Sequence, residues 1–242
     1  MPSETLTYRE GEDVFDAVIA RPLGGAVHPG ILVCHPWGGR DAAMEAKASR
    51  LAELGYVGAA IDVYGVGKRG VDAASSAALM GSLVADPPRL RRRLAAAFEA
   101  VGGLDGVDPD RMGAIGFCFG GLCSILTARM GLPLRGVVSF HGLLRTDATL
   151  AEPVHARILV LHGQDDPMVP PADVGAFAET MKRINADWEL HAYPGVGHAF
   201  TNPNAHDPAN GMAYDADADR RSWREMARFF EDVFAPTTEP QR

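Results

Sequence analysis

The sequence contains little cysteine, no excess of positive charge and no long hydrophobic run. Its three cysteines, Cys34, Cys118 and Cys123, lack the spacing of a disulfide framework or of a zinc site. Because 31 acidic residues outnumber 23 basic ones, the net charge of −8 argues against a nucleic-acid partner, whose phosphates need a basic face. No apolar stretch approaches the roughly 18 residues that a membrane helix requires, so no membrane partner is expected.

The amino terminus also lacks a targeting pattern. Residues 1–4 (MPSE) lead into further acidic residues, whereas a secretory signal has basic residues followed by an apolar run. A sparse, odd number of cysteines fits a reducing compartment. We therefore expect a soluble protein of the cytoplasm.

Apolar strand-like runs alternate with longer helical patterns along most of the chain. Strands are predicted at 6–9, 14–20, 31–34, 57–63, 112–117, 136–140, 158–162 and 188–193. Helices are predicted at 41–54, 89–101, 120–130, 174–184 and over a final amphipathic segment, 223–233. This alternation, with buried strands, predicts an α/β fold with a mostly parallel central sheet and helices on both faces. We expect one domain over residues 1–242.

Two segments do not follow this alternation. Residues 65–88 contain three early glycines and then many small side chains, and we interpret them as irregular, either a lid or a long surface connection. Residues 235–242 are rich in proline and threonine and are expected to fray.

The most specific motif is residues 116–121 (GFCFGG), which join a predicted strand to a predicted helix. This is the setting of a G-x-nucleophile-x-G elbow, in which a sharp turn projects the nucleophile from the sheet. The helix start supplies N–H groups and a positive dipole end that favour a thiolate and a developing oxyanion. Cys118 is therefore the predicted nucleophile and the Phe119 N–H a predicted oxyanion donor. Cys34 and Cys123 lack the motif and are predicted core residues, with a place in the pocket wall as the alternative for Cys34, which ends a strand near the expected site.

A carboxylate and a histidine follow the elbow. Asp166 lies on the loop after the predicted strand 158–162, ahead of a Pro-x-Val-Pro pattern, and Asp165 beside it is the alternative. His198 lies on a glycine-rich loop after the last predicted strand. The chain order of nucleophile, acid and histidine is that of the α/β-hydrolases, which selects His198 from the eight histidines.

Together these motifs resemble the dienelactone hydrolase family from about Val14 to Phe234. Residues 35–41 (HPWGGRD), 200–203 (FTNP) and 213–215 (AYD) are similar to stretches of that family as well. The resemblance implies an α/β-hydrolase fold, a Cys118–Asp166–His198 triad and a second oxyanion N–H at Trp37. It implies cleavage of a carboxylic ester or lactone through an acyl-enzyme.

The resemblance also suggests where a substrate pocket would lie. Its candidate residues here are His35, Pro36, His141, Phe200 and Asn202. The similar lactonases carry a glutamate where this chain has Pro36, and an arginine that grips the substrate carboxylate where it has Asn202. Without the planar guanidinium of that arginine, which can form two hydrogen bonds to a carboxylate, tight binding of an anionic dienelactone is not expected. A neutral ester or a different lactone is the predicted substrate, unless other basic residues substitute, namely Arg40, Lys68, Arg69 or Arg145.

Other functions remain as alternatives. The same residues could serve a thioesterase, an activated-amide hydrolase or a non-catalytic ligand-binding protein on the same fold. A redox role for Cys118 is disfavoured because no resolving cysteine lies at C-x-x-C spacing. No cofactor or metal is expected, since residues 215–219 (DADAD) lack the glycine and glutamate that complete a calcium loop. The oligomeric state is not predicted.

Overall fold

The computed structural model describes residues 3–145 and 153–235. Eight strands form one sheet in the order β1-β2-β4-β3-β5-β6-β7-β8. β2 runs antiparallel to both of its neighbours, and all other neighbouring pairs are parallel. The strands are β1 Ser3–Glu10, β2 Asp13–Ala20, β3 His28–Cys34, β4 Val57–Ile61, β5 Val107–Phe117, β6 Leu134–Phe140, β7 Arg157–Gly163 and β8 Trp188–Tyr193. The predicted mostly parallel sheet is confirmed.

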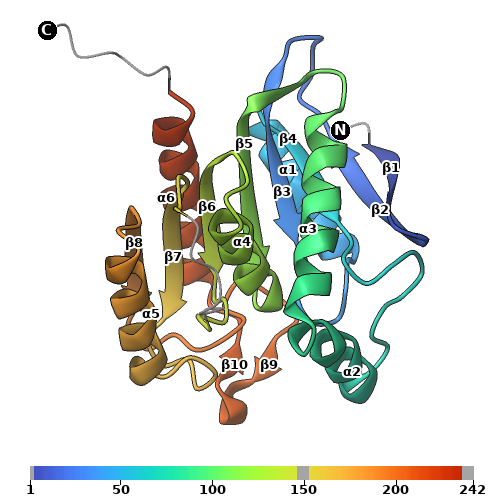
Figure 1. Ribbon diagram of the computed structural model, residues 1–242. Coiled ribbons are helices and arrows are strands. Elements are labelled where there is room, and N and C mark those ends of the chain that lie inside the picture. Colours follow the sequence, from blue (N-terminus) through green and yellow to red (C-terminus); the bar gives the residue numbers. More distant parts are fainter. Residues whose placement is uncertain (1–2, 146–152, 236–242) are drawn as a thin grey trace, which may run out of the picture.

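Helices cover both faces of this sheet (Figure 1). They are α1 Ala42–Glu53, α2 Ala73–Val84, α3 Pro87–Gly102, α4 Phe119–Arg129, α5 Pro171–Arg183 and α6 Ala216–Val233. One buried cluster contains residues of α3, α4 and α5, and a second contains residues of α1 and α6. Each face therefore has its own core, which explains why the central strands are apolar on both sides.

Local signals explain where the helices begin. Four of them start after an aspartate whose side chain accepts a hydrogen bond from a backbone N–H of the first turn, namely Asp41, Asp72, Asp86 and Asp215. Such caps satisfy N–H groups that have no partner within the helix. The acidic run 215–219 is thus the start of α6.

The interpretation of residues 65–88 as irregular is wrong over 73–84, which form α2. Asp72 and Ser75 make a reciprocal capping box at its start. Only Ser76 and Leu83 of this helix are buried, and most of its other residues are small, so its apolar face is weak. α2 lies beside the start of α3 (Figure 1).

Two short strands that the sequence did not predict support the loop after β8. β9 (His206–Asp207) pairs with β10 (Met212–Ala213), with a single 3-10 turn, Pro208–Asn210, between them. His198 bonds to this unit through its own N–H, 2.7 Å from the Gly211 carbonyl, and through its carbonyl, 3.2 Å from the Ala213 N–H. The predicted frayed tail, 235–242, lies outside the described residues apart from Ala235. None of the described helices is long and apolar enough to cross a membrane.

Candidate active site

Loops at the carboxyl ends of five neighbouring strands meet at one edge of the sheet (Figure 1). Open α/β sheets form ligand sites beyond these strand ends. The chain leaves β3, β5, β6, β7 and β8 here and enters the loops that carry the predicted site residues, namely His35 to Trp37, Cys118, His141, Asp166 and His198.

Cys118 occupies a strained turn between β5 and α4. Its φ of 56° and ψ of −116° are rare for a residue with a side chain and cost about 1–3 kcal/mol. A Cβ atom at Gly116 would lie 1.8 Å from the Gly120 carbonyl oxygen, and one at Gly120 would lie 2.1 Å from that of Cys34. The two glycines therefore allow the close packing that the turn requires. Cys118 is partly exposed, whereas Cys34 and Cys123 are buried in the core.

His198 and Asp166 form a hydrogen-bonded pair. His198 Nδ1 lies 2.7 Å from Asp166 Oδ2, and Asp166 Oδ1 accepts a second bond from the Met168 N–H at 2.8 Å. Because the carboxylate can only accept, Nδ1 carries a proton and Nε2 is left for another group. Both side chains are buried, whereas Asp165 is exposed, so the carboxylate at the histidine is that of Asp166.

The surroundings of His198 favour its charged form. Burial lowers its pKa, but hydrogen bonds to Asp166 and Cys118 outweigh burial and raise the pKa of His198 to about 10. Nε2 is buried and has no nitrogen or oxygen partner among the described residues, so the Cys118 thiol is the group it faces. The imidazole can therefore carry a proton beside the sulfur atom.

We expect His198 to stay protonated through neutral pH and to lose its proton as the pH rises toward about 10, because its raised pKa moves the transition above the usual 6.5. In Cys118→Ala, which removes one of the groups that raise this pKa, the midpoint should fall. The ring chemical shifts of His198, followed by NMR against pH, measure it. Cys123→Ala is the control and should leave the midpoint in place, and a wild-type midpoint near 6.5 would contradict the assignment.

His141 packs edge-on against the His198 ring. The ring centroids lie 5.1 Å apart, and His141 Nε2 lies 2.9 Å from Thr201 Oγ1. Burial first, and then the charge of His198, hold the pKa of His141 well below its usual value. The side chain beside His198 is therefore neutral and places no like charge against the imidazolium.

The two predicted oxyanion donors are the backbone N–H groups of Trp37 and Phe119. Phe119 is the first residue of α4, directly after Cys118, and Trp37 lies on the loop after β3. Within residues 3–145 and 153–235, neither N–H donates to another backbone group. Backbone N–H groups without a backbone partner are the kind of donor that can stabilise a developing oxyanion.

A cavity of about 1420 Å³ opens at this edge of the sheet. Cys118 and His198 line it, and so do four of the predicted site residues, namely Pro36, Trp37, His141 and Asn202. His35 and Phe200 are not in its wall, which corrects their assignment as pocket residues. They are 1% and 0% exposed, because the His35 ring turns back toward β4 and Phe200 packs against His141.

Two of the basic residues expected to replace the missing arginines are engaged elsewhere. Arg40 and Arg69 line the cavity, but Arg40 pairs with Asp16 at 2.9 Å and Arg69 lies 3.4 Å from Asp62. Lys68 is not in the wall, whereas Arg145 is.

Two basic residues of the wall, both on α1, were not predicted from the sequence, namely Arg50 and Lys47. The guanidinium of Arg50 lies over the Trp223 ring. The Nζ of Lys47 lies 4.7 Å from the centre of the Phe117 ring, beside the elbow, and burial lowers the pKa of this lysine. The sequence did contain an indication of the place of Lys47, since Lys47 follows Met44 by three positions in a predicted helix, and residues at that spacing lie on the same helix face. In the part of the chain that the structure describes, no three potential metal ligands gather.

Known proteins share this architecture. A crystal structure described as a dienelactone hydrolase-like promiscuous phosphotriesterase from metagenomic libraries is 32% identical, with a TM-score of 0.91 over 96% of this chain and 98% of that one. An uncharacterised protein of Caenorhabditis elegans is 37% identical over 155 residues, 61% of this chain and 96% of the relative. A Salmonella typhimurium protein provisionally named a carboxymethylenebutenolidase is 30% identical, over 79% of this chain and 74% of the relative.

The model of the dienelactone hydrolase family matches residues 15–234, which is nearly the whole chain. The match includes the elbow, the aspartate loop and the histidine loop. This protein therefore belongs to the dienelactone hydrolase family and is a hydrolase with the α/β-hydrolase fold.

Proposed function

We propose that the protein cleaves a carboxylic ester or lactone, with Cys118 as nucleophile, His198 as acid and base, and Asp166 as the group that orients the imidazole. One observation carries the proposal. His198 is held by Asp166 at 2.7 Å through Nδ1, which leaves Nε2 for a thiol on a strained strand-to-helix turn. This is the arrangement that nucleophilic catalysis needs, since an activated nucleophile requires a base that is itself held in place.

The reaction would proceed through an acyl-enzyme. The Cys118 thiolate attacks the carbonyl carbon, and the electron pair of the C=O bond moves to oxygen, where the Trp37 and Phe119 N–H groups stabilise it. Collapse of this intermediate expels the alcohol or ring oxygen, which takes the proton from His198. Water then attacks the thioester and gives a proton to His198, and the acid leaves while sulfur returns to the thiolate.

We propose a neutral ester or lactone as the substrate. Asn202 stands in the cavity wall where similar lactonases carry an arginine, and Arg40 and Arg69 are paired with acidic residues. A carboxylate on the substrate would therefore lose the bidentate partner that makes such binding strong, and Arg145 is the one predicted substitute that lines the wall without a pairing described above. Thioesters and activated amides could react by the same steps and are the nearest alternatives. A receptor without turnover would need no oriented acid–base pair beside a thiol.

Turnover of p-nitrophenyl acetate, a neutral enol-lactone and cis-dienelactone tests this proposal. We expect kcat/KM for the enol-lactone to exceed that for the anionic dienelactone at least about tenfold, because the dienelactone carboxylate would lose hydration in the cavity without gaining a charged partner. Mass spectrometry of the quenched reaction should find the acetyl group on the Cys118 peptide. Turnover fastest on dienelactone would contradict the substrate assignment, and a folded protein inactive on all three would favour a binding protein.

We also propose that the protein works in the cytoplasm. All three cysteines are free, and Cys118 must stay reduced to act as a nucleophile. Oxidation of the thiol to a sulfenic acid or a disulfide would remove the thiolate that attacks the carbonyl.

A further inference from the structure

The His35 ring lies outside the cavity wall but directly beneath the loop that carries Trp37. It is 1% exposed and makes two hydrogen bonds to the backbone. Nδ1 lies 2.7 Å from the Pro36 carbonyl oxygen, and Nε2 lies 3.2 Å from the Val63 nitrogen. The Pro36 carbonyl can only accept and the Val63 N–H can only donate, so Nδ1 must carry the proton and Nε2 must be unprotonated. Both partners together fix the position and the tautomer of the ring.

The bond to Pro36 bears on the Trp37 N–H because both groups belong to one peptide unit. A peptide unit is planar, and in the trans form its C=O and N–H point in opposite directions. This peptide is trans. The Gly39 N–H also donates to the Pro36 carbonyl, at 3.0 Å. When His35 holds this carbonyl from the buried side, it therefore helps to fix the direction in which the Trp37 N–H points.

The segment after β4 holds the same loop at further points. Tyr64 donates from its hydroxyl to the Trp37 carbonyl at 2.9 Å, and the Gly70 N–H donates to the Gly38 carbonyl at 2.9 Å. The loop is thus attached to its neighbour through the two carbonyls that follow the Trp37 N–H.

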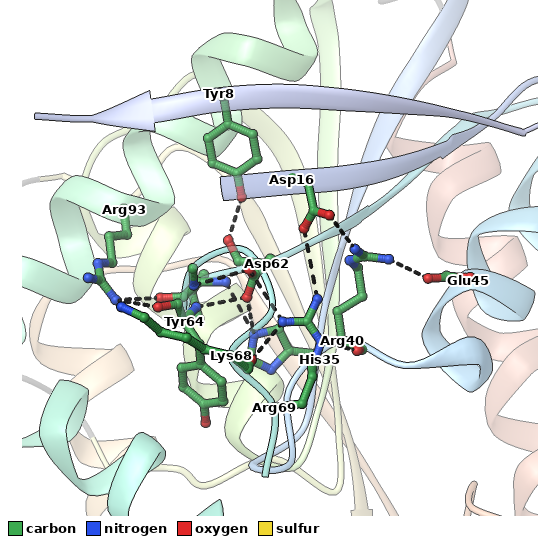
Figure 2. Close-up of polar contacts among 12 residues, drawn as sticks. Tyr8, Asp16, His35, Arg40, Glu45, Asp62, Tyr64, Lys68, Arg69 and Arg93 are labelled. Carbon is green, nitrogen blue, oxygen red and sulfur yellow. Dashed lines mark hydrogen bonds and ion pairs between the residues drawn. The ribbon is translucent and has the colours of Figure 1, made fainter. Parts of the chain in front are cut away.

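A buried carboxylate organises that neighbouring segment. Asp62 is 0% exposed and accepts from the Tyr64 and Gly65 N–H groups at 2.8 and 3.0 Å. Its Oδ1 lies 3.8 Å from His35 Nε2, and its backbone carbonyl accepts from the Tyr8 hydroxyl. Figure 2 shows Asp62 between Tyr8 and the His35 ring, with Tyr64 alongside. Burial lowers the pKa of His35, in keeping with the neutral ring that its two partners require.

We propose that His35 is a positioning residue for the Trp37 oxyanion donor, acting through the Pro36 carbonyl. The inference rests on the proposed function, in which the Trp37 N–H stabilises the tetrahedral intermediate. It assigns His35 a role in turnover without contact to the substrate. Loss of one oxyanion donor lowers kcat by about 10²–10³-fold, so a misdirected donor should be visible in kcat and not in KM.

Two substitutions of His35 each keep one of the two hydrogen bonds that the ring makes. In His35→Asn the side-chain amide lies where Nδ1 lies and can still donate to Pro36. In His35→Gln the amide reaches the place of Nε2 and can accept from Val63, but the Pro36 bond is lost. We expect kcat on p-nitrophenyl acetate to fall about 10²-fold in His35→Gln, with KM unchanged, and much less in His35→Asn, which serves as the conservative rescue. Thermal unfolding of both variants reports any loss of stability, which should be similar.

A milder pair of variants tests the same inference if the His35 variants do not fold. Tyr64→Phe removes only the hydroxyl that holds the Trp37 carbonyl, and Tyr56→Phe removes a hydroxyl on the other face of the sheet, among the rings of α6. We expect kcat to fall in the first and not in the second. The Trp37 amide resonance should shift in His35→Gln and Tyr64→Phe, which requires no turnover.

Failure of this inference differs from failure of the proposed function. If wild-type turnover does not depend on Cys118, the proposed function is wrong. If turnover depends on Cys118 but His35→Gln and His35→Asn lose kcat equally, or lose none, His35 does not position the donor. An unshifted Trp37 amide in His35→Gln would overturn the inference as well.

Discussion

Replacing Cys118 with alanine should lower kcat/KM for p-nitrophenyl acetate about 10⁴-fold, a loss of about 5.5 kcal/mol of transition-state stabilisation. Alanine cannot form the thioester, so the two-step route through an acyl-enzyme closes. The oxyanion donors and the cavity remain, and in other triad enzymes such groups still give a residual acceleration over water. Steady-state hydrolysis in a thiol-free buffer measures the effect, since free thiols would themselves attack the ester.

Cys123→Ala is the matched control, because it removes a thiol from the same helix without touching the cavity. Cys123 is 1% exposed, and burial raises its pKa well above the usual value, so it is not a nucleophile at neutral pH. We expect this variant to lose about 1 kcal/mol of stability and to keep the wild-type kcat/KM. Equal losses of activity in the two variants, or full activity in Cys118→Ala, would rule out Cys118 as the nucleophile.

The sequence predicted those parts of the fold that have strong local signals. β8 has the predicted bounds, Trp188–Tyr193, because it combines aromatic and apolar residues with clear flanking turns. The start of α1 was predicted to within one residue, at Asp41, which lies two positions after Gly39 and caps the helix. The elbow could be predicted because its glycines are required by a local feature, the close packing of a strand against the helix that follows it.

The sequence could not predict elements held by distant contacts. β9 and β10 have two residues each and are stabilised through the His198 backbone, so neither has a periodicity of its own. α2 has small residues on most of its surface, and a helix with a weak apolar face gives little pattern to read. Its capping box was the one available signal.

At the site, the directions of the side chains were what the sequence could not predict. The position of His35 at a strand end predicts that it lies near the elbow, and its ring centroid lies 6.3 Å from that of Phe119. Its ring turns away from the cavity because Val63, 28 residues later in the chain, supplies the donor for Nε2. The choice between Asp165 and Asp166 was open for the same reason. The Asp165 N–H bonds to the Val196 carbonyl at 2.9 Å while its side chain is exposed, and nothing local to the sequence encodes that contact.

The elbow itself should be highly sensitive to a single methyl group. We expect Gly116→Ala to destabilise the protein by about 4–5 kcal/mol or more, a large part of the 5–15 kcal/mol typical of a folded domain. The new Cβ would lie 1.8 Å from the Gly120 carbonyl oxygen and 2.8 Å from the Gly121 nitrogen. Both are backbone atoms at the start of α4, so no rotation of a side chain relieves the clash. The strand or the helix must move, which would also displace Cys118.

Gly175→Ala provides the comparison, since it adds the same methyl group where there is space for it. Gly175 lies on the exposed side of α5, and nothing lies within 4 Å of a Cβ atom built there. Alanine in a helix interior is favoured over glycine by about 0.5–1 kcal/mol, so this variant should be slightly more stable than wild type. Urea unfolding of the two variants beside wild type measures both changes. A Gly116→Ala protein as stable as wild type would mean that the strand and helix do not pack at the elbow as closely as the structure has them, and the strained position of Cys118 would lose its physical basis.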